Sequence, residues 1–573
     1  MPTNSANSSS LRIINKLKPA LGFLLSVVLL NILMNINYPA VGLETQTLLK
    51  ISPEILIILG FICTATLFGI RFSRFLYMPL TAIVLFLRLF RIGDTLIPMY
   101  FFRPFNLYLD SQFLPDLIHL LYTTFTSRQF LLFAVLTIAL LVGITWGVWI
   151  SFKTIHNYLL DFYQRRIVVG LTIAALMSIY VLQSDPDNHR RDLFAQGFFH
   201  RVVEEGDFIL HVKGYRDQYL KTIDTAKKKI EQLPTSMDKL QRANVLLLFV
   251  ESYGHTIYAE NRHFTKILPA LKRLEKELTE SGNSACSAFL NSPTFGGSSW
   301  LAHATLGSGV NLNNQMRYNL LITSTAKTIA QFFNRIGYRT VSVMPGTQWP
   351  WPEGEFFGYQ KKYYAWDFDY KGPVYGWSTM PDQYVLDFIF NREIQGQTNP
   401  LFIEFILNSS HAPFHRQPPY VEDWSQIGSG KIYHDLEVIT FPIIWPDLSN
   451  AAEGYVTSIA YELKVIVEFI IKFIDDDTLI VVLGDHQPNV QITGKQASWS
   501  VPIHVISRNR NHLQPFLYQG YTPGLIPTQP LPHRGMQTFL FDFLSDFSTP
   551  VGAKRKSRFI GEPENIEKSN IIN

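Results

Sequence analysis

The sequence predicts a chain in two parts, an α-helical membrane domain of about five spans followed by an α/β domain. Three observations carry this prediction. The chain has 573 residues, which is too long for one ordinary domain. Its first third holds five long apolar runs, and its remainder alternates short strand-like runs with helical spacing. We place the membrane domain at 1–186, a connector at 187–235, the α/β domain at 236–551 and a disordered basic and polar tail at 552–573.

The membrane domain rests on apolar runs that come close to the roughly 20 residues needed to cross a bilayer. The first run follows a basic segment, as in a secretory signal, but it lacks a small-residue cleavage site and four more runs follow. We therefore expect an anchor. The predicted spans are 20–36, 53–70, 76–99, 130–152 and 167–182.

Basic residues orient these spans, because loops rich in Lys and Arg stay on the cytoplasmic side. An odd number of spans then places everything after about residue 183 outside the cytoplasmic (inner) membrane, in a multi-pass protein with a periplasmic or otherwise extracytoplasmic catalytic domain. The residues that carry the argument are Arg12, Lys16, Lys18, Arg71, Arg74, Lys153, Arg165 and Arg166.

The third span carries charges at membrane depth: Arg88, Arg91 and Asp94. Such charges are costly and normally face protein, water or a polar ligand. Three interpretations stay open. Arg91 and Asp94 pair internally, the span starts late and the charges snorkel to the interface, or the charges line a polar pocket for a lipid headgroup near the outer surface.

Composition excludes some functions. A formal net charge of +4 without a basic helix argues against nucleic acid as a partner. Two cysteines, Cys63 and Cys286, lie far apart in chemically different segments, so we expect no disulfide between them.

After a charged, helical connector, expected to lie along the membrane surface, the α/β pattern begins. Apolar runs predict strands, and residues 263–278 and 455–473 have amphipathic helical spacing. Alternating strands and helices predict a sheet covered on both faces, with ligands at the carboxyl ends of its strands. The predicted strands are 244–250, 338–344, 401–407, 478–483 and 502–506.

Three of these strands end in residues that can do chemistry. Glu251 follows the first strand and is either a helix cap or a metal ligand. Asp485 and His486 end another, where they either form a turn or present a carboxylate and an imidazole to one ion. His411, in Asn-Ser-Ser-His-Ala-Pro, is either a loop residue or a group that protonates a leaving group.

A glycine-rich loop, Phe-Gly-Gly-Ser298-Ser299-Trp, precedes a helix-compatible stretch. A serine at a helix start is usually a cap. It can also be a nucleophile aided by the helix dipole and activated by a bound metal. His303, one turn further on, is expected to be a bystander.

This ordered set, behind five spans, resembles the sulfatase-like branch of the alkaline phosphatase superfamily. It is most similar to membrane-anchored transferases: lipoteichoic acid synthases, phosphoglycerol transferases and phosphoethanolamine transferases. The similarity covers about 244–508 at the level of motifs. The resemblance implies an alkaline-phosphatase-like (sulfatase-like) α/β fold for the second domain.

By that resemblance, the metal would be bound by Glu251, Ser299, Asp485 and His486. The nucleophile would be Ser299, with Ser298 as the alternative. His411 would contact the phosphoryl group. The donor set suits Mn²⁺ or Zn²⁺ better than Mg²⁺. These transferases usually carry Thr as the nucleophile, and phosphoethanolamine transferases usually hold several disulfides, so the subfamily stays open. The Cys/Ser-x-Pro-x-Arg motif of formylglycine sulfatases is absent near Ser299.

The predicted function is metal-dependent transfer of a phospho-headgroup, of phosphoglycerol or phosphoethanolamine type, from a membrane phospholipid to a cell-envelope glycan or lipid acceptor. The transfer would run through a covalent Ser299 intermediate. An extracytoplasmic phosphodiesterase of the same superfamily is the first alternative, and a catalytically silent sensor or scaffold is the second.

Overall fold

The protein is described by a computed structural model. It describes residues 5–550 apart from 37, 39–47, 49, 71–73, 116–117, 119–121, 123–125, 184–194, 196–198, 376–378, 443–448, 476 and 528–533. The predicted tail at 552–573 lies outside the described residues.

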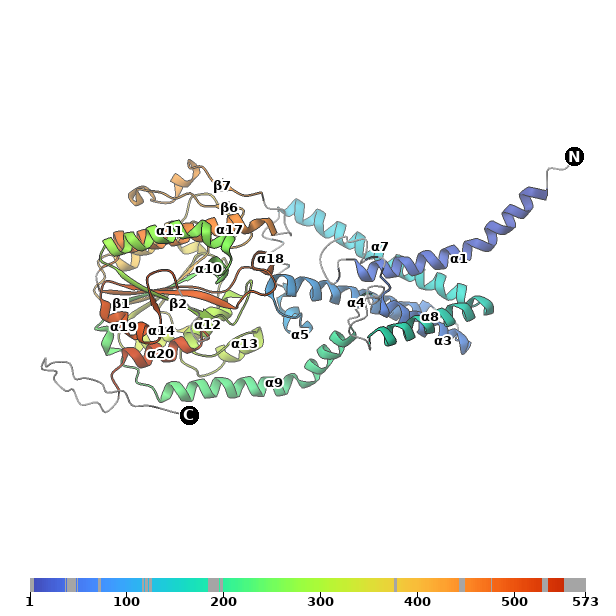
Figure 1. The fold of residues 1–573 in the computed structure, drawn as a ribbon, viewed down its shortest axis with the longest axis horizontal. Coiled ribbons are helices and arrows are strands. Elements are labelled where there is room, and N and C mark those ends of the chain that lie inside the picture. The colour runs from blue at the N-terminus through green and yellow to red at the C-terminus, as the bar shows by residue number, and fades with distance from the viewer. Residues whose placement is uncertain are drawn as a thin grey trace.

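The N-terminal third is a bundle of helices that extends away from a sheet-containing domain (Figure 1). Every apolar run of the sequence forms a helix there. Among the described residues, three helices are long and apolar enough to cross a membrane, over Leu17–Asn35, Phe75–Phe101 and Ser127–Leu159, and the apolar helix at Pro53–Leu67 is shorter. The predicted count of about five spans is therefore not confirmed. The helices are α1 (Ser5–Asn35), α3 (Pro53–Leu67), α4 (Arg74–Phe101), α7 (Ser127–Leu159) and α8 (Phe162–Gln183).

Buried ion pairs hold α4 to its neighbours. Arg91 Nη2 lies 2.7 Å from Glu54 Oε2 of α3, and its Nη1 donates to the carbonyl of Met34 at 2.6 Å. Asp94 Oδ1 lies 3.1 Å from Arg201 Nε. Arg91 and Asp94 are thus both paired inside the protein, each with an opposite charge on another helix.

The connector forms one long helix, α9 (Phe199–Glu231). It runs beside the α/β domain in roughly the direction of the membrane helices, and not across them as expected for a helix on the membrane surface (Figure 1). Arg201 near its start also donates to the carbonyl of Phe105, and Lys227 Nζ near its end lies 2.9 Å from Thr325 Oγ1. The helix therefore contacts both parts of the chain.

The C-terminal domain is built on an eight-stranded sheet with the order β10-β2-β9-β8-β1-β5-β3-β4. The central strand β1 pairs in parallel with β5 and β8, and β9 lies antiparallel between β8 and β2. The strands are β1 (Asn244–Val250), β2 (Ser284–Asn291), β3 (Arg339–Met344), β4 (Lys361–Tyr364), β5 (Leu401–Leu407), β8 (Thr478–Gly484), β9 (Ser500–Ser507) and β10 (Thr522–Pro523).

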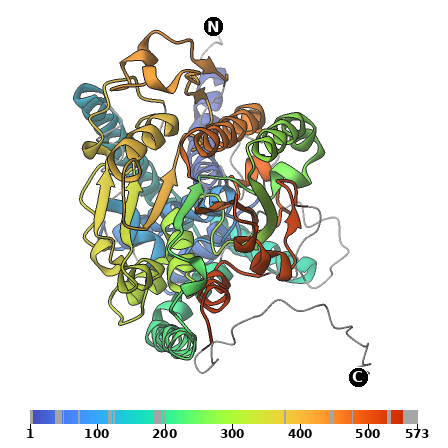
Figure 2. The same cartoon turned by 90° about the vertical axis from the view of Figure 1, so that its left-hand side faces the viewer.

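Helices cover both faces of this sheet (Figures 1 and 2). On β1 the side chains alternate: Leu246 and Leu248 join the core under one helical layer, and Leu247 and Phe249 join the core under the other. This explains the unbroken apolar run of the strand, because a strand covered on both faces has no polar side. One layer holds α10 (Thr256–Ala259), α11 (Asn261–Glu280), α16 (Asp382–Ile389) and α17 (Ala452–Phe473); the other holds α12 (Ser299–Ser308), α13 (Gln315–Ile322), α14 (Ile329–Arg335) and α20 (Thr538–Phe547).

Candidate active site

The carboxyl ends of the parallel strands meet at one edge of the sheet, as expected for an open α/β domain. Glu251 directly follows β1, and Asp485 and His486 directly follow β8, the strand paired with it. Strand β2 runs in the same direction as β8, since β9 is antiparallel to both. Its end therefore delivers the glycine-rich loop to the same edge.

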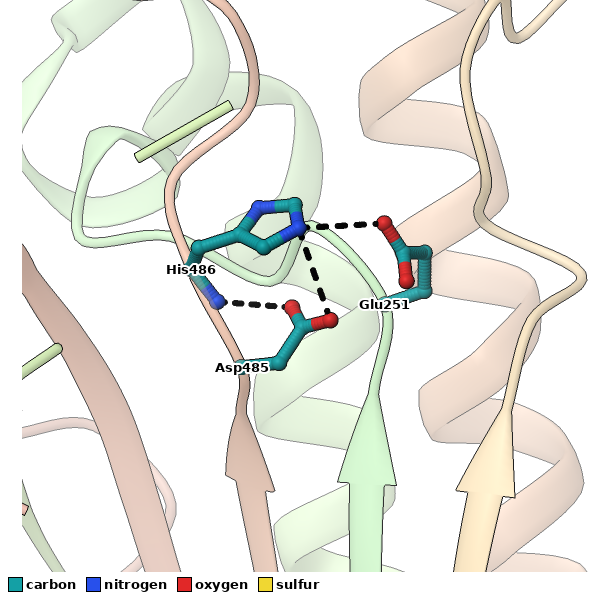
Figure 3. Close-up of side chains that lie close together, drawn as sticks. All are labelled: Glu251, Asp485 and His486. Carbon is teal, nitrogen blue, oxygen red and sulfur yellow. Dashed lines mark hydrogen bonds and ion pairs between the residues drawn. The ribbon is translucent and has the colours of Figure 1, made fainter. Parts of the chain in front are cut away.

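Glu251, Asp485 and His486 converge on one point (Figure 3). One ligand atom from each lies within 4.8 Å of the others. His486 Nε2 is 3.3 Å from Glu251 Oε1 and 3.6 Å from Asp485 Oδ2, and at most 9% of any of these side chains is exposed.

Backbone contacts aim these ligand atoms. Asp485 Oδ1 accepts from the N–H groups of Ser252 at 2.8 Å and His486 at 2.6 Å, which leaves Oδ2 for the site. His486 Nδ1 lies 2.8 Å from the Gln487 carbonyl. Because a carbonyl only accepts, Nδ1 carries a proton, and Nε2 is the nitrogen that faces the site and has a lone pair for a metal when it is unprotonated.

The electrostatics of the three residues are strongly perturbed. Burial together with the Glu251 carboxylate raises the pKa of Asp485 to about 8. Burial disfavours the charged form of His486, but Asp485 and Glu251 outweigh it and raise its pKa to about 9. Burial likewise opposes ionisation of Glu251, yet the charges of His411 and His486 hold the pKa of that carboxyl below its usual range. The buried site thus holds two carboxyl groups and little positive charge to balance them.

This donor set fits a divalent cation. Two carboxylates and an imidazole with a free Nε2 are ligands that Mn²⁺ and Zn²⁺ accept, and they lie close enough to share one ion. A cation of charge +2 would also offset the excess negative charge of the buried carboxylates.

Ser299 is the first residue of α12, with Ser298 as its cap. Its Oγ lies 3.0 Å from Glu251 Oε2 and 3.1 Å from His486 Nε2. The preceding loop has positive φ at Gly296, Gly297 and Ser298, a conformation that costs free energy at the serine and not at the glycines. The structure thus brings Ser299 to the three converging side chains, while Ser298 lines a cavity beside them.

His411 lies on the loop after β5, next to β1. This loop is fixed from two sides: Ser410 Oγ donates to the Glu251 carbonyl at 2.6 Å, and the Asp382 carboxylate accepts from the N–H groups of Asn408 at 2.7 Å and Ser409 at 2.5 Å. The imidazole is close enough to lower the pKa of Glu251. His411 therefore borders the site without being one of its three converging ligands.

Sequence reasoning missed Asp382, which sits at the start of α16 and orients the His411 loop. The signal available was an acidic residue after Met-Pro at a helix start. His303, expected to be a bystander, lies with its ring 4.2 Å from the ring of Phe249, and burial lowers its pKa to about 3. It is therefore a neutral side chain packed behind the site.

Comparison with known proteins agrees with this architecture. Residues 243–516 match the family model described as sulfatase. No curated protein matches the chain.

Several solved structures are similar over about half of the chain. The lipoteichoic acid synthase LtaP of Listeria monocytogenes is 14% identical over 54% of this chain and 75% of its own, with a TM-score of 0.34. The phosphoglycerol transferase GacH of Streptococcus pyogenes, solved with sn-glycerol-1-phosphate, is 13% identical over 57% and 92%, with a TM-score of 0.33. The soluble domain of the Neisseria meningitidis lipooligosaccharide phosphoethanolamine transferase A is 10% identical over 53% and 89%, with a TM-score of 0.36.

The family match spans seven of the eight strands of the sheet, the glycine-rich loop and the three converging side chains. Residues 243–516 are therefore a sulfatase-like domain.

Proposed function

We propose that the chain transfers a phospho-headgroup, of phosphoglycerol or phosphoethanolamine type, from a membrane phospholipid to a glycan or lipid acceptor of the cell envelope. The observation that carries the proposal is the placement of the Ser299 hydroxyl, 3.0 Å from Glu251 and 3.1 Å from His486, at the start of a helix. We assign 1–186 to the membrane, 187–235 to the connector and 236–551 to an extracytoplasmic catalytic domain at the cytoplasmic membrane.

The residues around Ser299 support a nucleophilic role. The hydroxyl lies 3.0 Å from Oε2 of the Glu251 carboxylate, which can take its proton. The first N–H groups of α12 and its dipole favour negative charge at the attacked phosphorus. A divalent cation held by Glu251, Asp485, His486 and the Ser299 oxygen, with Mn²⁺ or Zn²⁺ favoured, would stabilise that charge and lower the pKa of the hydroxyl.

The first half of the reaction forms a bond between Ser299 Oγ and phosphorus and breaks the bond from phosphorus to the diacylglycerol oxygen. Ser299 gives up its proton, and the leaving oxygen departs with the bonding electrons and takes a proton. We assign that donation to His411, which borders the site beside β5.

In the second half, an acceptor hydroxyl loses its proton and bonds to phosphorus, while the bond from phosphorus to Ser299 Oγ breaks and the serine is protonated again. His411 then acts as the base. When water is the acceptor, the same steps amount to hydrolysis.

The test uses the full chain in phospholipid vesicles, with diacylglycerol release as the readout and mass spectrometry of the peptide that contains Ser299. We expect a headgroup adduct on that peptide, and we expect Ser299→Ala to lower release by about 10³-fold or more, because the attacking atom is gone. Ser298→Ala is the comparison variant, and it should lose far less activity because it keeps the Ser299 oxygen. An adduct on Ser298, or full activity of Ser299→Ala, contradicts the assignment.

Two further conditions refine the same assay. A chelator should stop release, and Mn²⁺ or Zn²⁺ should restore it; unchanged release in the chelator contradicts metal dependence. Release that requires an added glycan or lipid acceptor identifies a transferase, whereas equal release without an acceptor identifies a phosphodiesterase.

A further inference from the structure

The last turn of the membrane helix α4 packs against the glycine-rich loop between β2 and α12, residues 292–298, which we call the nucleophile loop. A Cβ atom on Gly296 would lie 1.9 Å from the carbonyl oxygen of Tyr100, and one on Gly297 would lie 2.7 Å from the ring of Phe101. Only glycine fits at these distances. The loop that presents Ser299 is thus shaped in part by a helix that comes from the membrane domain, and Figure 1 shows α4 reaching the α/β domain beside α18 (Val490–Thr493).

Aromatic contacts continue this packing beyond the helix. The ring of Phe102 lies 5.1 Å from that of Phe295 and 6.3 Å from that of Trp499. Phe295 belongs to the nucleophile loop, and Trp499 immediately precedes β9. The contact between the two parts of the chain therefore lies at the catalytic edge of the sheet.

A cavity of about 340 Å³ lies in this contact, lined from both sides. Phe101 and Arg103 come from the membrane domain; Ser298, Asn311, Asn313 and Trp499 come from the sulfatase-like domain. Among the described residues that line it, Arg103 is the one with a formal charge. A space with a guanidinium, amides, hydroxyls and aromatic rings suits an anion that carries hydroxyl groups.

The guanidinium of Arg103 is held in place. Its Nη1 and Nη2 contact Asp110 Oδ2 at 3.1 Å and Oδ1 at 2.5 Å, and Nη1 also contacts the carbonyl of Pro104 at 3.3 Å. These contacts use three of the five N–H groups of an arginine, and 29% of the side chain stays exposed. Asp110 thus orients the group while donors remain for a ligand.

The position of Arg103 relative to the bilayer indicates that the anion belongs to a lipid. The apolar span in α4 ends at Phe101, so Arg103 follows the hydrocarbon-crossing segment by two residues. Lipid phosphates lie just outside the hydrocarbon core, which is where arginines interact with them.

We propose that this cavity binds the phosphate-bearing, hydroxyl-bearing headgroup of a glycerophospholipid, with Arg103 of the membrane domain as a binding residue. This inference rests on the proposed function, because it supplies the lipid donor to Ser299. The chemistry recognised is that of a glycerol phosphate, whether attached to a lipid or free.

The test measures binding, so that it does not depend on turnover. The full chain carrying Ser299→Ala is placed in phosphatidylcholine nanodiscs and titrated with glycerol phosphate by calorimetry. Adding Arg103→Gln should weaken binding at least about tenfold, the usual cost of losing a charge-assisted contact to phosphate. Arg103→Lys should recover part of the affinity.

Two controls separate a binding role from a structural one. Asp110→Asn breaks the ion pair but keeps the guanidinium, so it should weaken binding less than Arg103→Gln. Arg273→Gln removes an exposed charge from α11 and should leave binding unchanged. Equal losses for Arg103→Gln and Asp110→Asn, or no loss for Arg103→Gln, overturn the inference.

Phosphatidylglycerol in the nanodiscs identifies the natural source. If it competes with glycerol phosphate in the Ser299→Ala chain and not in the chain with Arg103→Gln, the cavity takes the lipid-borne headgroup. If it does not compete, the assignment to a lipid is wrong. A lack of diacylglycerol release by the unmodified chain would instead refute the proposed function and leave the binding result standing.

Discussion

Two buried clusters of charge, one in each part of the molecule, are organised in opposite ways. In the N-terminal helical part, Arg91 pairs with Glu54, and Asp94 pairs with Arg201 of the connector helix α9, so each of these two carboxylates meets a guanidinium. At the candidate active site, the carboxylates of Glu251 and Asp485 both lie close to one imidazole, that of His486. We call the first group the membrane cluster and the second the site cluster.

The two clusters are similarly buried, so burial alone does not separate them. The Arg91 side chain is fully buried and that of Glu54 is 8% exposed, against 1% for Asp485 and 9% for Glu251. The clusters differ in whether each buried negative charge has a positive partner of its own. Balanced buried pairs fix the arrangement of helices, whereas an excess of buried negative charge costs free energy that a bound cation recovers. The comparison teaches that the unbalanced cluster marks the binding site.

The largest expected effect comes from removing one charge of the site cluster. Glu251→Gln should lower diacylglycerol release by about 10²–10³-fold or more, since a ligand and a proton acceptor are lost together. Without added metal, Asp485→Asn should leave the melting temperature at neutral pH unchanged or raise it, because burial and the Glu251 carboxylate already raise the pKa of Asp485 to about 8 and disfavour its ionised form.

Release assays and thermal unfolding of the detergent-solubilised chain measure the two quantities. Glu280→Gln, on the exposed end of α11, is the control for loss of a carboxylate. An active Glu251→Gln chain, together with an Asp485→Asn chain that is less stable without metal, would show that the site cluster is structural.

Breaking the membrane cluster should give the reverse pattern. Arg91→Met leaves the Glu54 carboxylate buried without its guanidinium, and we expect a loss of about 3–5 kcal/mol in the free energy of unfolding. The double change of Arg91→Met with Glu54→Leu should recover most of that loss, since no charge is left unpaired. If the single and double variants were equally stable, the pair would not hold α3 to α4.

A smaller effect sharpens the comparison with a buried carboxyl outside both clusters. Glu404 lies on β5, where the hydroxyl of Tyr359 donates to it, and burial raises its pKa from the ordinary 4.5 to about 8. The folded chain therefore binds a proton that the unfolded chain has lost between these values, so stability falls as the pH rises from 4.5 to 8.

Glu404→Gln removes this titration. We expect it to raise the free energy of unfolding at pH 8.5 by about 1–3 kcal/mol relative to the parent, with little change at pH 4.5. Melting temperatures across that range are the measurement. An equal shift at both pH values would mean that the carboxyl is ionised in the fold throughout.

The local pattern of apolar and polar residues predicted much of the α/β domain. Strands β1 and β5 occur over the predicted residues because their runs are apolar on both faces, and α12 begins at Ser299 as expected. Strand β2 was missed, since Ser-Ala-Cys-Ser-Ala has small and polar residues that give no strand signal. Residues at strand ends were found because sheet geometry alone brings them together.

Contacts between distant elements could not be predicted in the same way. The sequence gives no sign that Arg91 finds Glu54, which lies 37 residues away on another helix. Nor does it indicate that Tyr100 and Phe101 lie against Gly296 and Gly297, because that contact depends on how the two parts of the chain dock.

Helix α9 has a mechanical consequence. With 33 residues it is about 50 Å long, and it joins the membrane bundle to the flank of the α/β domain while α4 joins the same two bodies elsewhere. A body attached at two separate points cannot swivel about either one. We therefore expect Ser299 to stay at a constant height above the bilayer, so that an acceptor must travel to the enzyme and molecules anchored in the same leaflet arrive most readily.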